Sequence, residues 1–396
     1  MPLNHGATVK TSADTRSMQA MVFGLVAASF TAVYITQPVL PVIRMEFGVS
    51  ETTASLTVSA VILGIAIANL PFGVLSDRYP IRPILLGGAA VVTAASLFCA
   101  ATRGIWLLIA ARFVQGLFIP SLTTCLAAYL ARSLPLERLN VVMGSYVSAT
   151  IAGGLGGRLL GGWIHPPLHW RYAFVTSAAL LVAAAGAAAR ILPHEPAERA
   201  PEEAGVGFLQ LVSRAEVLRM LAVAFTAFFV FSAIFNYLPF YLSAPPIRAP
   251  LRIVTLLYLA YVVGMVAGPL AGKLSNRLGS GPTMSLGAAV LALAITCTLI
   301  PSLGVIAASL PAVCGGFFGM HAAALGTLNR RLTSSRGRAN SLYVLSYYLG
   351  GASGISAAGY AYTHAGWRGC VTLGVVVLLV PFGIGLFESA KARRSA

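Results

Sequence analysis

The stretch GVLSDRYPIRP occupies residues 73–83 and lies between two long apolar segments. A close copy, GKLSNRLGSGP, occupies residues 272–282, so Gly272 follows Gly73 by 199 residues. A Trp-Arg pair at residues 170–171 also recurs, 197 residues later, at 367–368. Two motifs repeated at nearly the same spacing predict that the chain consists of two halves with the same fold.

The composition predicts an all-α membrane protein. Hydrophobic residues make up 57% of the chain and charged residues 10%, whereas soluble proteins average about 25% charged residues. Apolar segments of 18 or more residues recur along the whole length, and each is long enough to cross a bilayer as a helix. The short alternating strands of a membrane barrel are absent from the sequence.

We expect twelve transmembrane helices in two pseudo-symmetric six-helix bundles. The predicted spans are residues 18–42, 53–74, 83–102, 105–130, 140–163, 171–192, 217–243, 251–273, 283–303, 305–328, 339–362 and 369–389. The Pro- and Glu-rich segment 193–216 reads as a cytoplasmic linker between the bundles. The predicted parts are therefore a tail at 1–17, a bundle at 18–192, this linker, a bundle at 217–390 and a tail at 391–396.

The net charge of +16 has two interpretations, a nucleic-acid partner or a topology signal. The basic residues are scattered through short loops and form no patch, which argues against nucleic acid. Of the 27 Lys and Arg residues, the predicted spans place 19 on the side of the termini, 6 on the other side and 2 within spans. This bias predicts that both termini are cytoplasmic.

No motif for an enzyme or a cofactor occurs in the sequence. There is no phosphate-binding loop, which argues against ATP as the energy source. The five cysteines all lie inside apolar segments and read as small hydrophobic residues, not as metal ligands or disulfides. The polar residues 1–17 precede an apolar stretch without a small-residue cleavage site, so we expect an uncleaved first span.

Residues 73–83 resemble the signature loop between the second and third helices of major facilitator superfamily transporters. Further segments resemble bacterial inner-membrane transporters in the drug:proton antiporter branch of twelve-helix exporters. These are YITQPVLPVI (34–43), ARFVQG (111–116), YVSATIAGGLGGRLLGG (146–162), FNYLPFYL (235–242), FFGMHAAALG (317–326) and SLYVLSYYLGG (341–351). The resemblance covers nearly the whole chain. It implies a monomeric inner-membrane exporter whose halves rock around a central cavity, exchanging a small organic molecule for protons without a cofactor.

The resemblance assigns a conformational role to the repeated loops. It implies that glycine allows close helix packing and that Asp77, Arg78 and Arg82 form a cytoplasmic ion-pair latch. The physical basis is pairing of charges beside a helix terminus. The second copy contributes Gly272, Asn276 and Arg277 where the first has Gly73, Asp77 and Arg78, and its uncharged Asn276 predicts a weaker latch. The alternative is a solvated loop that only sets topology.

Proton coupling requires a side chain that can carry a proton through the membrane. Arg112 matches the fourth-helix arginine that the family links to proton transfer. It cannot release a proton itself, so it would tune a neighbour or hold an anion; the alternative is a structural arginine between helices. None of the eleven acidic residues lies near the middle of a predicted span. The candidate proton carriers are therefore Asp77 and His321, although His321 can equally contact substrate or only pack.

The fifth predicted span is rich in glycine, and Arg158 stands where the antiporters have a proline. Two interpretations are open. Arg158 lies near the outer end of its span, so it can snorkel to the surface. Alternatively, it acts together with Gly157 and Gly161 at an interface or gate between the halves.

The polar residues on the helices that surround the cavity in this family are candidate substrate contacts. They are Tyr34, Gln37, Gln115, Asn236, Tyr237, His321 and, from the eleventh span, Tyr347. Aromatic rings with a few amides suit an amphipathic organic molecule. A dedicated exporter or facilitator of one metabolite, sugar or siderophore, without proton coupling through a buried acid, is the alternative within transport. A receptor is disfavoured by the short linker, and a membrane enzyme by acids and histidines that do not converge.

Overall fold

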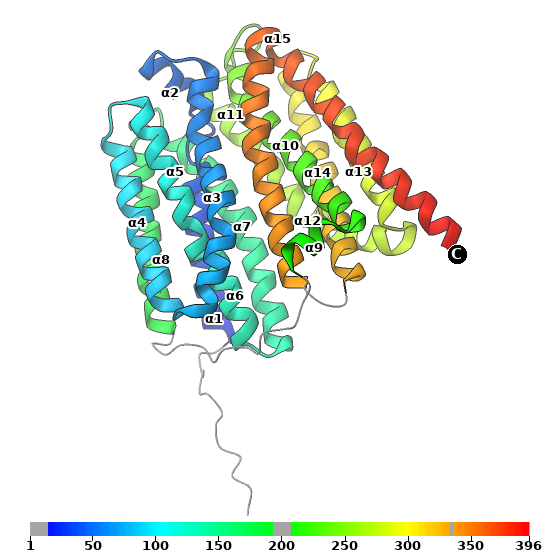
Figure 1. The fold of residues 1–396 in the computed structure, drawn as a ribbon. Helices are drawn as coiled ribbons and strands as arrows, with labels where there is room; N and C mark the ends of the chain where they lie inside the picture. The colour runs from blue at the N-terminus through cyan, green and yellow to red at the C-terminus, as the bar shows by residue number, and fades with distance from the viewer. Residues whose placement is uncertain (1–14, 193–206, 333–335, 396) are drawn as a thin grey trace, which may run out of the picture.

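A computed structural model describes residues 15–192, 207–332 and 336–395 of the chain. These residues form helices joined by short loops, and no strand occurs among them (Figure 1). Ten of the helices in the described part are long and apolar enough to cross a membrane. The predicted all-α membrane class is therefore confirmed.

The first half of the chain forms one bundle, in which α1 packs against α7 and α8, and α3 and α4 pack against α5. Its helices are α1 (Thr15–Tyr34), α2 (Leu40–Phe47), α3 (Glu51–Arg78), α4 (Ile81–Ala101), α5 (Ile105–Leu122), α6 (Thr124–Ser133), α7 (Leu136–Ile164) and α8 (Tyr172–Ile191). The predicted first span, 18–42, is too long, because α1 ends at Tyr34 and a turn containing Pro38 leads into α2. The predicted fourth span divides into α5 and α6 just after Pro120.

The second half forms an equivalent bundle around contacts of α10 with α15 and of α13 with α14. Its helices are α9 (Phe208–Val212), α10 (Ala215–Ser243), α11 (Leu251–Leu257), η1 (Tyr258–Ala260), α12 (Tyr261–Leu278), α13 (Ser280–Cys297), α14 (Leu303–Arg331) and α15 (Arg336–Ser395). The short helix α9 lies within the predicted linker 193–216, of which residues 193–206 are outside the described residues.

Two features relate these helices to the twelve predicted spans. The backbone of α15 is not helical at Ala365 and Gly366, which divides its 60 residues into two helices. Gly366 has φ +58° and ψ −147°, a conformation that essentially only glycine adopts. Helix α7 is 29 residues long but contains seven glycines and Arg158, and it is not one of those ten helices. The helices are thus consistent with twelve spans.

The two signature loops occupy equivalent places in the halves. Residues 73–83 join α3 to α4, and residues 272–282 join α12 to α13. The Arg132 guanidinium at the end of α6 donates a hydrogen bond to the Ser76 carbonyl at 2.7 Å. In the second half, Arg330 at the end of α14 contacts the Ser280 hydroxyl. Each loop is therefore held by an arginine from the end of a neighbouring helix.

Glycines extend the repeat into the helix packing. A Cβ added at Gly153 or Gly157 of α7 would lie 2.3 Å from a backbone carbonyl oxygen of α1. At Gly350 and Gly354 of α15, which follow them by 197 residues, a Cβ would lie 2.1 and 2.2 Å from carbonyl oxygens of α10. In both halves, these glycines allow two helices to approach at a distance that no side chain permits.

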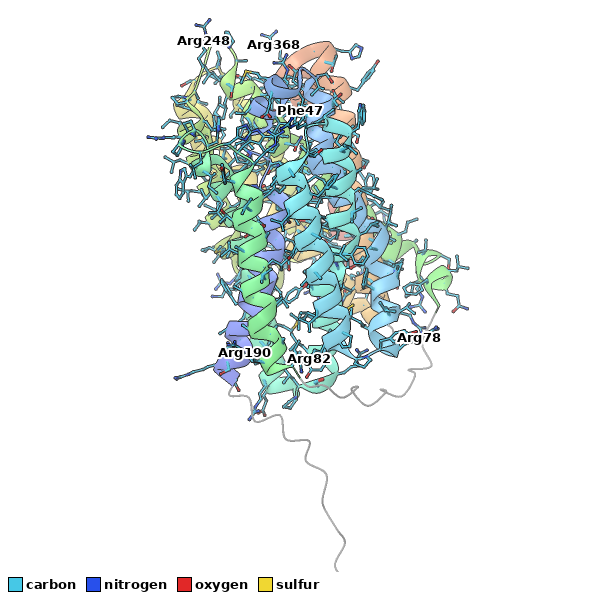
Figure 2. The ribbon with its side chains drawn as sticks, turned by 90° about the vertical axis from the view of Figure 1, so that its left-hand side faces the viewer. Phe47, Arg78, Arg82, Arg190, Arg248 and Arg368 are labelled. Carbon is cyan, nitrogen blue, oxygen red and sulfur yellow. The ribbon has the colours of Figure 1, made fainter. Side chains whose placement is uncertain are left out.

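The arginines separate toward the two ends of the molecule. Figure 2 shows Arg78, Arg82 and Arg190 at one end, and Arg248 and Arg368 with Phe47 at the other. We call the first the signature end, because it carries residues 73–83, and the second the α2 end. The segregation has the pattern that the Lys and Arg count predicts from the sequence.

Candidate functional site

A cavity of about 1950 Å³ lies between the two halves of the molecule. Its walls come from α1, α3, α6 and α7 of the first half and from α10, α12, α14 and α15 of the second. It begins at the signature end beside Arg78, Tyr79 and Arg338, and its lining extends inward to Gln37 and Arg158. Tyr79 is 59% exposed, so the cavity is open to solvent at the signature end.

Toward the α2 end, the two halves contact each other directly. The Ser59 hydroxyl of α3 donates a hydrogen bond to the Ala352 carbonyl of α15 at 3.0 Å. The hydroxyls of Thr52 and Thr363 on the same two helices are 3.3 Å apart. Helix α7 also contacts α11 and α12. These contacts close the α2 end while the signature end is open.

The second half supplies an aromatic wall to the cavity. The rings of Phe228 and Tyr347 are stacked, with their centroids 3.8 Å apart. Tyr348 stands perpendicular to Tyr347, with a centroid distance of 5.2 Å. Phe231, one turn along α10 from Phe228, also lines the cavity. Rings arranged in this way present flat apolar surfaces with hydroxyl groups at their edges, which suits an aromatic ligand.

His321 lies on α14 within this wall. Its Nδ1 atom is 3.1 Å from the Tyr343 hydroxyl, and its ring centroid is 5.2 Å from that of Tyr347. Of the predicted substrate contacts, Tyr34, Gln37, His321 and Tyr347 line the cavity. The structure therefore brings together residues from α1, α14 and α15, and from the turn after α1.

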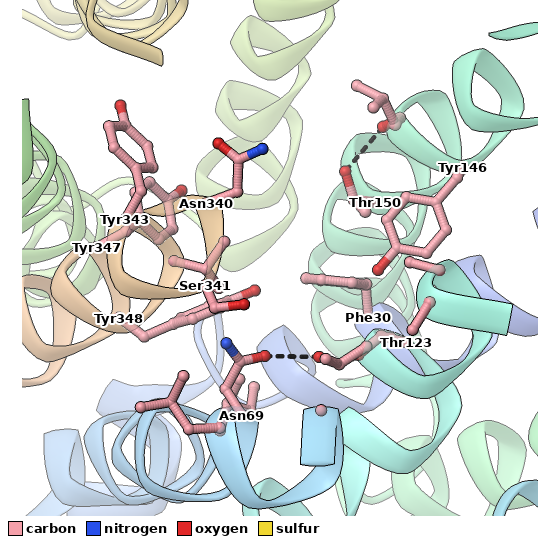
Figure 3. A pocket seen from close by; sticks show the side chains of 18 of the residues that line it. Phe30, Asn69, Thr123, Tyr146, Thr150, Asn340, Ser341, Tyr343, Tyr347 and Tyr348 are labelled. Atoms are coloured by element: carbon pink, nitrogen blue, oxygen red, sulfur yellow. Dashed lines mark hydrogen bonds between the residues drawn. The ribbon is translucent and has the colours of Figure 1, made fainter. Parts of the chain in front are cut away.

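The opposite wall contains polar residues that the sequence reasoning missed. Thr124 donates a hydrogen bond to the side-chain oxygen of Asn69 at 2.6 Å. Tyr146 and Thr150 of α7 line the same wall, and Figure 3 shows them across the cavity from Tyr343, Tyr347 and Tyr348. A signal was available for Tyr146, because it precedes Tyr343 by the same 197 residues that separate the repeated motifs.

The charged side chains described in the cavity lining are all positive. The described residues that line it include Arg78, Arg132, Arg158 and Arg338, but no Asp or Glu. The side chain of Asp77 lies outside the described part of the structure. The described charged side chains of the lining are thus all guanidinium groups, which attract anions.

Arg158 does not snorkel to the surface, because its residue is only 3% exposed. Its guanidinium donates hydrogen bonds to the Gln37 side-chain oxygen at 2.6 Å, to the Gly154 carbonyl at 2.7 Å and to the Tyr261 hydroxyl at 3.0 Å. The guanidinium carbon also lies 3.9 Å from the ring centroid of Tyr34 and 4.2 Å from that of Tyr261. Since Tyr261 belongs to α12, Arg158 connects the two halves.

Gly157 and Gly161 do not lie at an interface between the two halves, which was one interpretation of the sequence. A Cβ at Gly157 would meet the Thr31 carbonyl oxygen at 2.3 Å, and at Gly161 the Ile35 carbonyl oxygen at 1.9 Å. Both neighbours belong to the first half, so these two glycines pack within a half and not between the halves. The adjacent Gly162 faces Thr255 of α11 and is the glycine of this segment that contacts the other half.

Arg112 of α5 is fully buried and lies outside the cavity lining. It donates hydrogen bonds to the carbonyls of Ala32 at 2.6 Å and Thr57 at 2.9 Å, and also to the carbonyl of Val33. Ala32 and Val33 are in the last turn of α1, where carbonyls have no partner within the helix. Arg112 thus caps the carboxyl end of α1, where the helix dipole favours a cation.

Three other predicted substrate contacts do not line the cavity. Gln115 is fully buried, accepts a hydrogen bond from Arg112 and donates one to Ser96 at 2.6 Å. Asn236 and Tyr237 are fully buried on α10, about one turn nearer the α2 end than the lining residue Ser232. They lie outside because the cavity ends before the helices meet at the α2 end.

The residues of the predicted latch are all at helix ends or in the signature loops. No atom lies within 4 Å of a Cβ built at Gly73 or Gly272, so the close packing expected at these glycines is absent where the cavity is open. Asn276 and Arg277 end α12 with exposed side chains. Arg78 is the last residue of α3, and Arg82 lies in the first turn of α4. Both are at the signature end (Figure 2).

A sequence profile described as the Major Facilitator Superfamily matches residues 22–334 and 251–394. The chain belongs to this superfamily. It is 29% identical over 372 residues to the inner membrane transport protein YnfM of Escherichia coli (strain K12), covering 92% of this chain and 88% of that protein. It is 31% identical over 150 residues to the multidrug resistance protein B homolog of Mycobacterium tuberculosis (strain CDC 1551 / Oshkosh), covering 38% of this chain and 28% of that protein.

The fold has a match among solved structures. A bacterial homolog of the human lysosomal transporter Spinster, solved in an inward-facing and unoccupied conformation, superposes with a TM-score of 0.75. The match covers 97% of this chain and 98% of that one, at 14% sequence identity. The major facilitator fold and the transporter class predicted from sequence are thus confirmed, and the protein is a transporter and not an enzyme.

Proposed function

We propose that this chain is an exporter of the bacterial inner membrane that moves a small organic molecule by alternating access, in exchange for protons. The observation that carries the proposal is the cavity between two equivalent halves, open at the signature end and closed at the α2 end. A cavity open to one side at a time is what rocking of two bundles around a central site requires.

The direction of export rests on the expected orientation. The excess of Lys and Arg on the side of the termini favours a cytoplasmic signature end and two cytoplasmic termini. The cavity would then be open to the cytoplasm, which is the state that loads a molecule for export. The stretch of similarity to a multidrug resistance protein supports the same direction.

For proton exchange, His321 is the best placed carrier. It is the one described lining side chain that ordinarily changes charge near neutral pH, and the adjacent Tyr343 hydroxyl can hold or pass a proton. Asp77 at the signature end is the second candidate. Arg112 supports the arrangement of the helices in this proposal, because its partners are neutral and it does not reach the cavity.

In the alternate state, in which the cavity opens at the α2 end, the predicted latch would hold the signature end closed. Asp77, Arg78 and Arg82 would pair across this end when the cavity opens at the α2 end, with Asn276 and Arg277 making the weaker contact in the second half. We expect one chain to suffice, because both walls of the cavity come from a single polypeptide.

Proton movement in inverted membrane vesicles, followed with a dye that reports the pH gradient, tests the proposal. Addition of transported aromatic compounds should collapse the gradient in the wild type, and His321→Gln should reduce the collapse about tenfold. His364→Gln is the matched control, since His364 is exposed near the α2 end of α15. Uptake of the same compounds into the vesicles should be measured in parallel with a radiolabel.

A second function is favoured by one observation, the lack of acidic side chains among the described residues that line the cavity. Without a carboxylate, the protein would be a facilitator or exporter of one metabolite that moves without protons. Uptake of labelled compound with no change in the pH gradient would support this second function and contradict the first.

A further inference from the structure

Arg158 is a buried cation whose partners in the described structure are all neutral. They are an amide oxygen, a backbone carbonyl and a phenol hydroxyl, and these bonds use three of the five guanidinium N–H groups. An arginine withdrawn from water inside a membrane is costly unless an anion or a strong acceptor set compensates its charge. Arg158 therefore has no counter-charge among the described residues.

Two partly exposed arginines and the buried Arg112 show how this chain compensates such a charge elsewhere. Arg219 and Arg331 both pair with the carboxylate of Glu388, whose side chain is only 3% exposed. Arg112 interacts with the carboxyl end of α1. Besides its three neutral hydrogen-bond acceptors, Arg158 has the faces of Tyr34, Tyr258 and Tyr261. Cation–π contacts offset part of the desolvation without neutralising the charge.

Arg158 is also reachable from solvent through the cavity. Together with Tyr34, Gln37 and Tyr261 it forms the innermost part of the lining. Arg132 and Arg338 line the path nearer the signature end. This succession of positive charges attracts anions toward Arg158, and the described lining holds no acidic side chain to repel them.

We infer that Arg158 binds an oxyanion group, a carboxylate or a phosphate, of an aromatic substrate. The inference rests on the proposed function, in which the cavity carries the transported molecule. The anion oxygens would accept charge-assisted hydrogen bonds from the guanidinium, while the ring of the substrate lies against the stacked pair Phe228 and Tyr347. Because Tyr261 is on the other half, an anion that competes for Arg158 would also weaken a contact between the halves.

Binding to the purified full-length protein in detergent tests this inference by calorimetry. The probes are 2-naphthoate, its uncharged analogue 2-naphthamide, phenyl phosphate and inorganic phosphate. We expect the wild type to bind naphthoate and phenyl phosphate about tenfold or more tightly than naphthamide. Inorganic phosphate should bind weakly, because it lacks the ring.

The variants are Arg158→Gln and Arg158→Lys, with Arg190→Gln as the control because Arg190 is an exposed residue at the end of α8. Arg158→Gln should remove the preference for the anions, Arg158→Lys should keep part of it, and Arg190→Gln should keep all of it. Elution as a single monodisperse species shows that each variant is folded. Should Arg158→Gln fail to fold, the graded loss in Arg158→Lys remains the test.

Equal binding of naphthoate and naphthamide, no binding of either anion, or an unchanged preference in Arg158→Gln would overturn the inference. If inorganic phosphate binds as tightly as phenyl phosphate, the site does not require an aromatic ring, and that part of the inference is overturned. The vesicle assay separates this result from the proposed function. Transport of 2-naphthoate that is insensitive to Arg158→Gln leaves the exporter standing and removes the anion site. Binding of 2-naphthoate that depends on Arg158, without transport of it, keeps the anion site and contradicts the exporter.

Discussion

Arg112 and Arg158 show how the same side chain acquires different roles from its surroundings. Both are buried in apolar helices. Arg112 donates to carbonyls in the last turn of α1 and to a carbonyl of α3, so it replaces hydrogen bonds that the end of a helix lacks. Arg158 has partners from both halves and faces the cavity. We therefore expect substitutions at Arg112 to change stability and substitutions at Arg158 to change ligand binding.

Arg112→Ala should lower the free energy of unfolding by roughly 3 kcal/mol or more, because it leaves a space and buried carbonyls without their donor. Arg112→Lys should recover part of this loss, since one ammonium group can still cap α1. The melting temperature of the purified protein measures both effects. A normal melting temperature in Arg112→Ala together with lost proton exchange would instead support the family's role in proton transfer.

Gly157 permits the contact of α7 with α1. Gly157→Ala places a methyl group 2.3 Å from the Thr31 carbonyl oxygen, and we expect a loss of stability of about 1–3 kcal/mol from the overpacking. Gly156→Ala is the matched control on the same helix, because its Cβ would lie 3.6 Å from the Thr31 hydroxyl. Equal melting temperatures of the two variants would show that the helices separate at no cost.

At the scale of elements, helix α2 is fastened to the start of α8 by an acidic residue. Glu46 contacts the Arg171 guanidinium, accepts a hydrogen bond from the Trp170 indole and lies 3.4 Å from His169. Partial burial opposes ionisation of Glu46, but the hydrogen bonds from Arg171 and Trp170 outweigh it, so the pKa of Glu46 lies below its ordinary value of 4.5. The ionised carboxylate therefore stabilises the folded state.

The lowered pKa of Glu46 predicts how the stability of the folded state depends on pH. A lowered pKa contributes stability that is complete above pH 4.5 and is lost as the pH falls through the pKa of the folded state. The melting temperature of the wild type should therefore fall between about pH 5 and about pH 3, and Glu46→Gln should fall less steeply over that range. Parallel curves for the two proteins would show that another carboxylate is responsible.

The element boundaries show what hydropathy can and cannot predict. Length and apolar content locate the spans, because a bilayer imposes both. The end of α1 at Tyr34 was missed because the next eight residues, ITQPVLPV, are as apolar as the helix itself. The turn there depends on Pro38, and proline is compatible with several local structures in membrane helices. The division of α15 at Gly366 was predicted as two spans, since Gly366 and Arg368 interrupt the apolar run.

At the scale of the whole molecule, the sequence predicts which helices surround the cavity better than which side chains reach it. Tyr34, Gln37, His321 and Tyr347 line it. Gln115, Asn236 and Tyr237 do not, because helix rotation and the depth at which the cavity ends are set by contacts between helices. Asn69, Thr124 and Tyr146 were missed for the same reason. A polar residue in a span indicates an interior position, but a helix interface and a cavity both satisfy that pattern.

The packing within the halves differs from the packing between them. Glycine seams bring α7 onto α1 and α15 onto α10 at backbone distances within each half. Between the halves, toward the α2 end, the polar contacts include hydroxyl groups of α3 and α15 and the hydrogen bond of Arg158 to Tyr261. Hydroxyl contacts can be exchanged for water when they separate, at a net cost of about 1 kcal/mol each. The halves are therefore suited to move as units that part at the α2 end.

A reversible cross-link across these hydroxyls tests whether transport requires that separation. The Ser59 and Ser356 hydroxyls, from opposite halves, are 3.4 Å apart. In a background without the five native cysteines, Ser59→Cys with Ser356→Cys should form a disulfide on oxidation and lose at least about tenfold in transport, because the α2 end can no longer open. A reductant should restore transport.

The matched control is a cross-link within one half. Gln19 of α1 and Ser145 of α7 share a hydrogen bond of 3.2 Å, and Gln19→Cys with Ser145→Cys joins helices that are expected to move together. Its oxidation should leave transport nearly unchanged. Full transport by the oxidised Ser59–Ser356 pair would mean that the α2 end stays closed during turnover. The molecule would then leave by a route that does not separate α3 from α15, and rocking of the two halves would have to be abandoned as the mechanism.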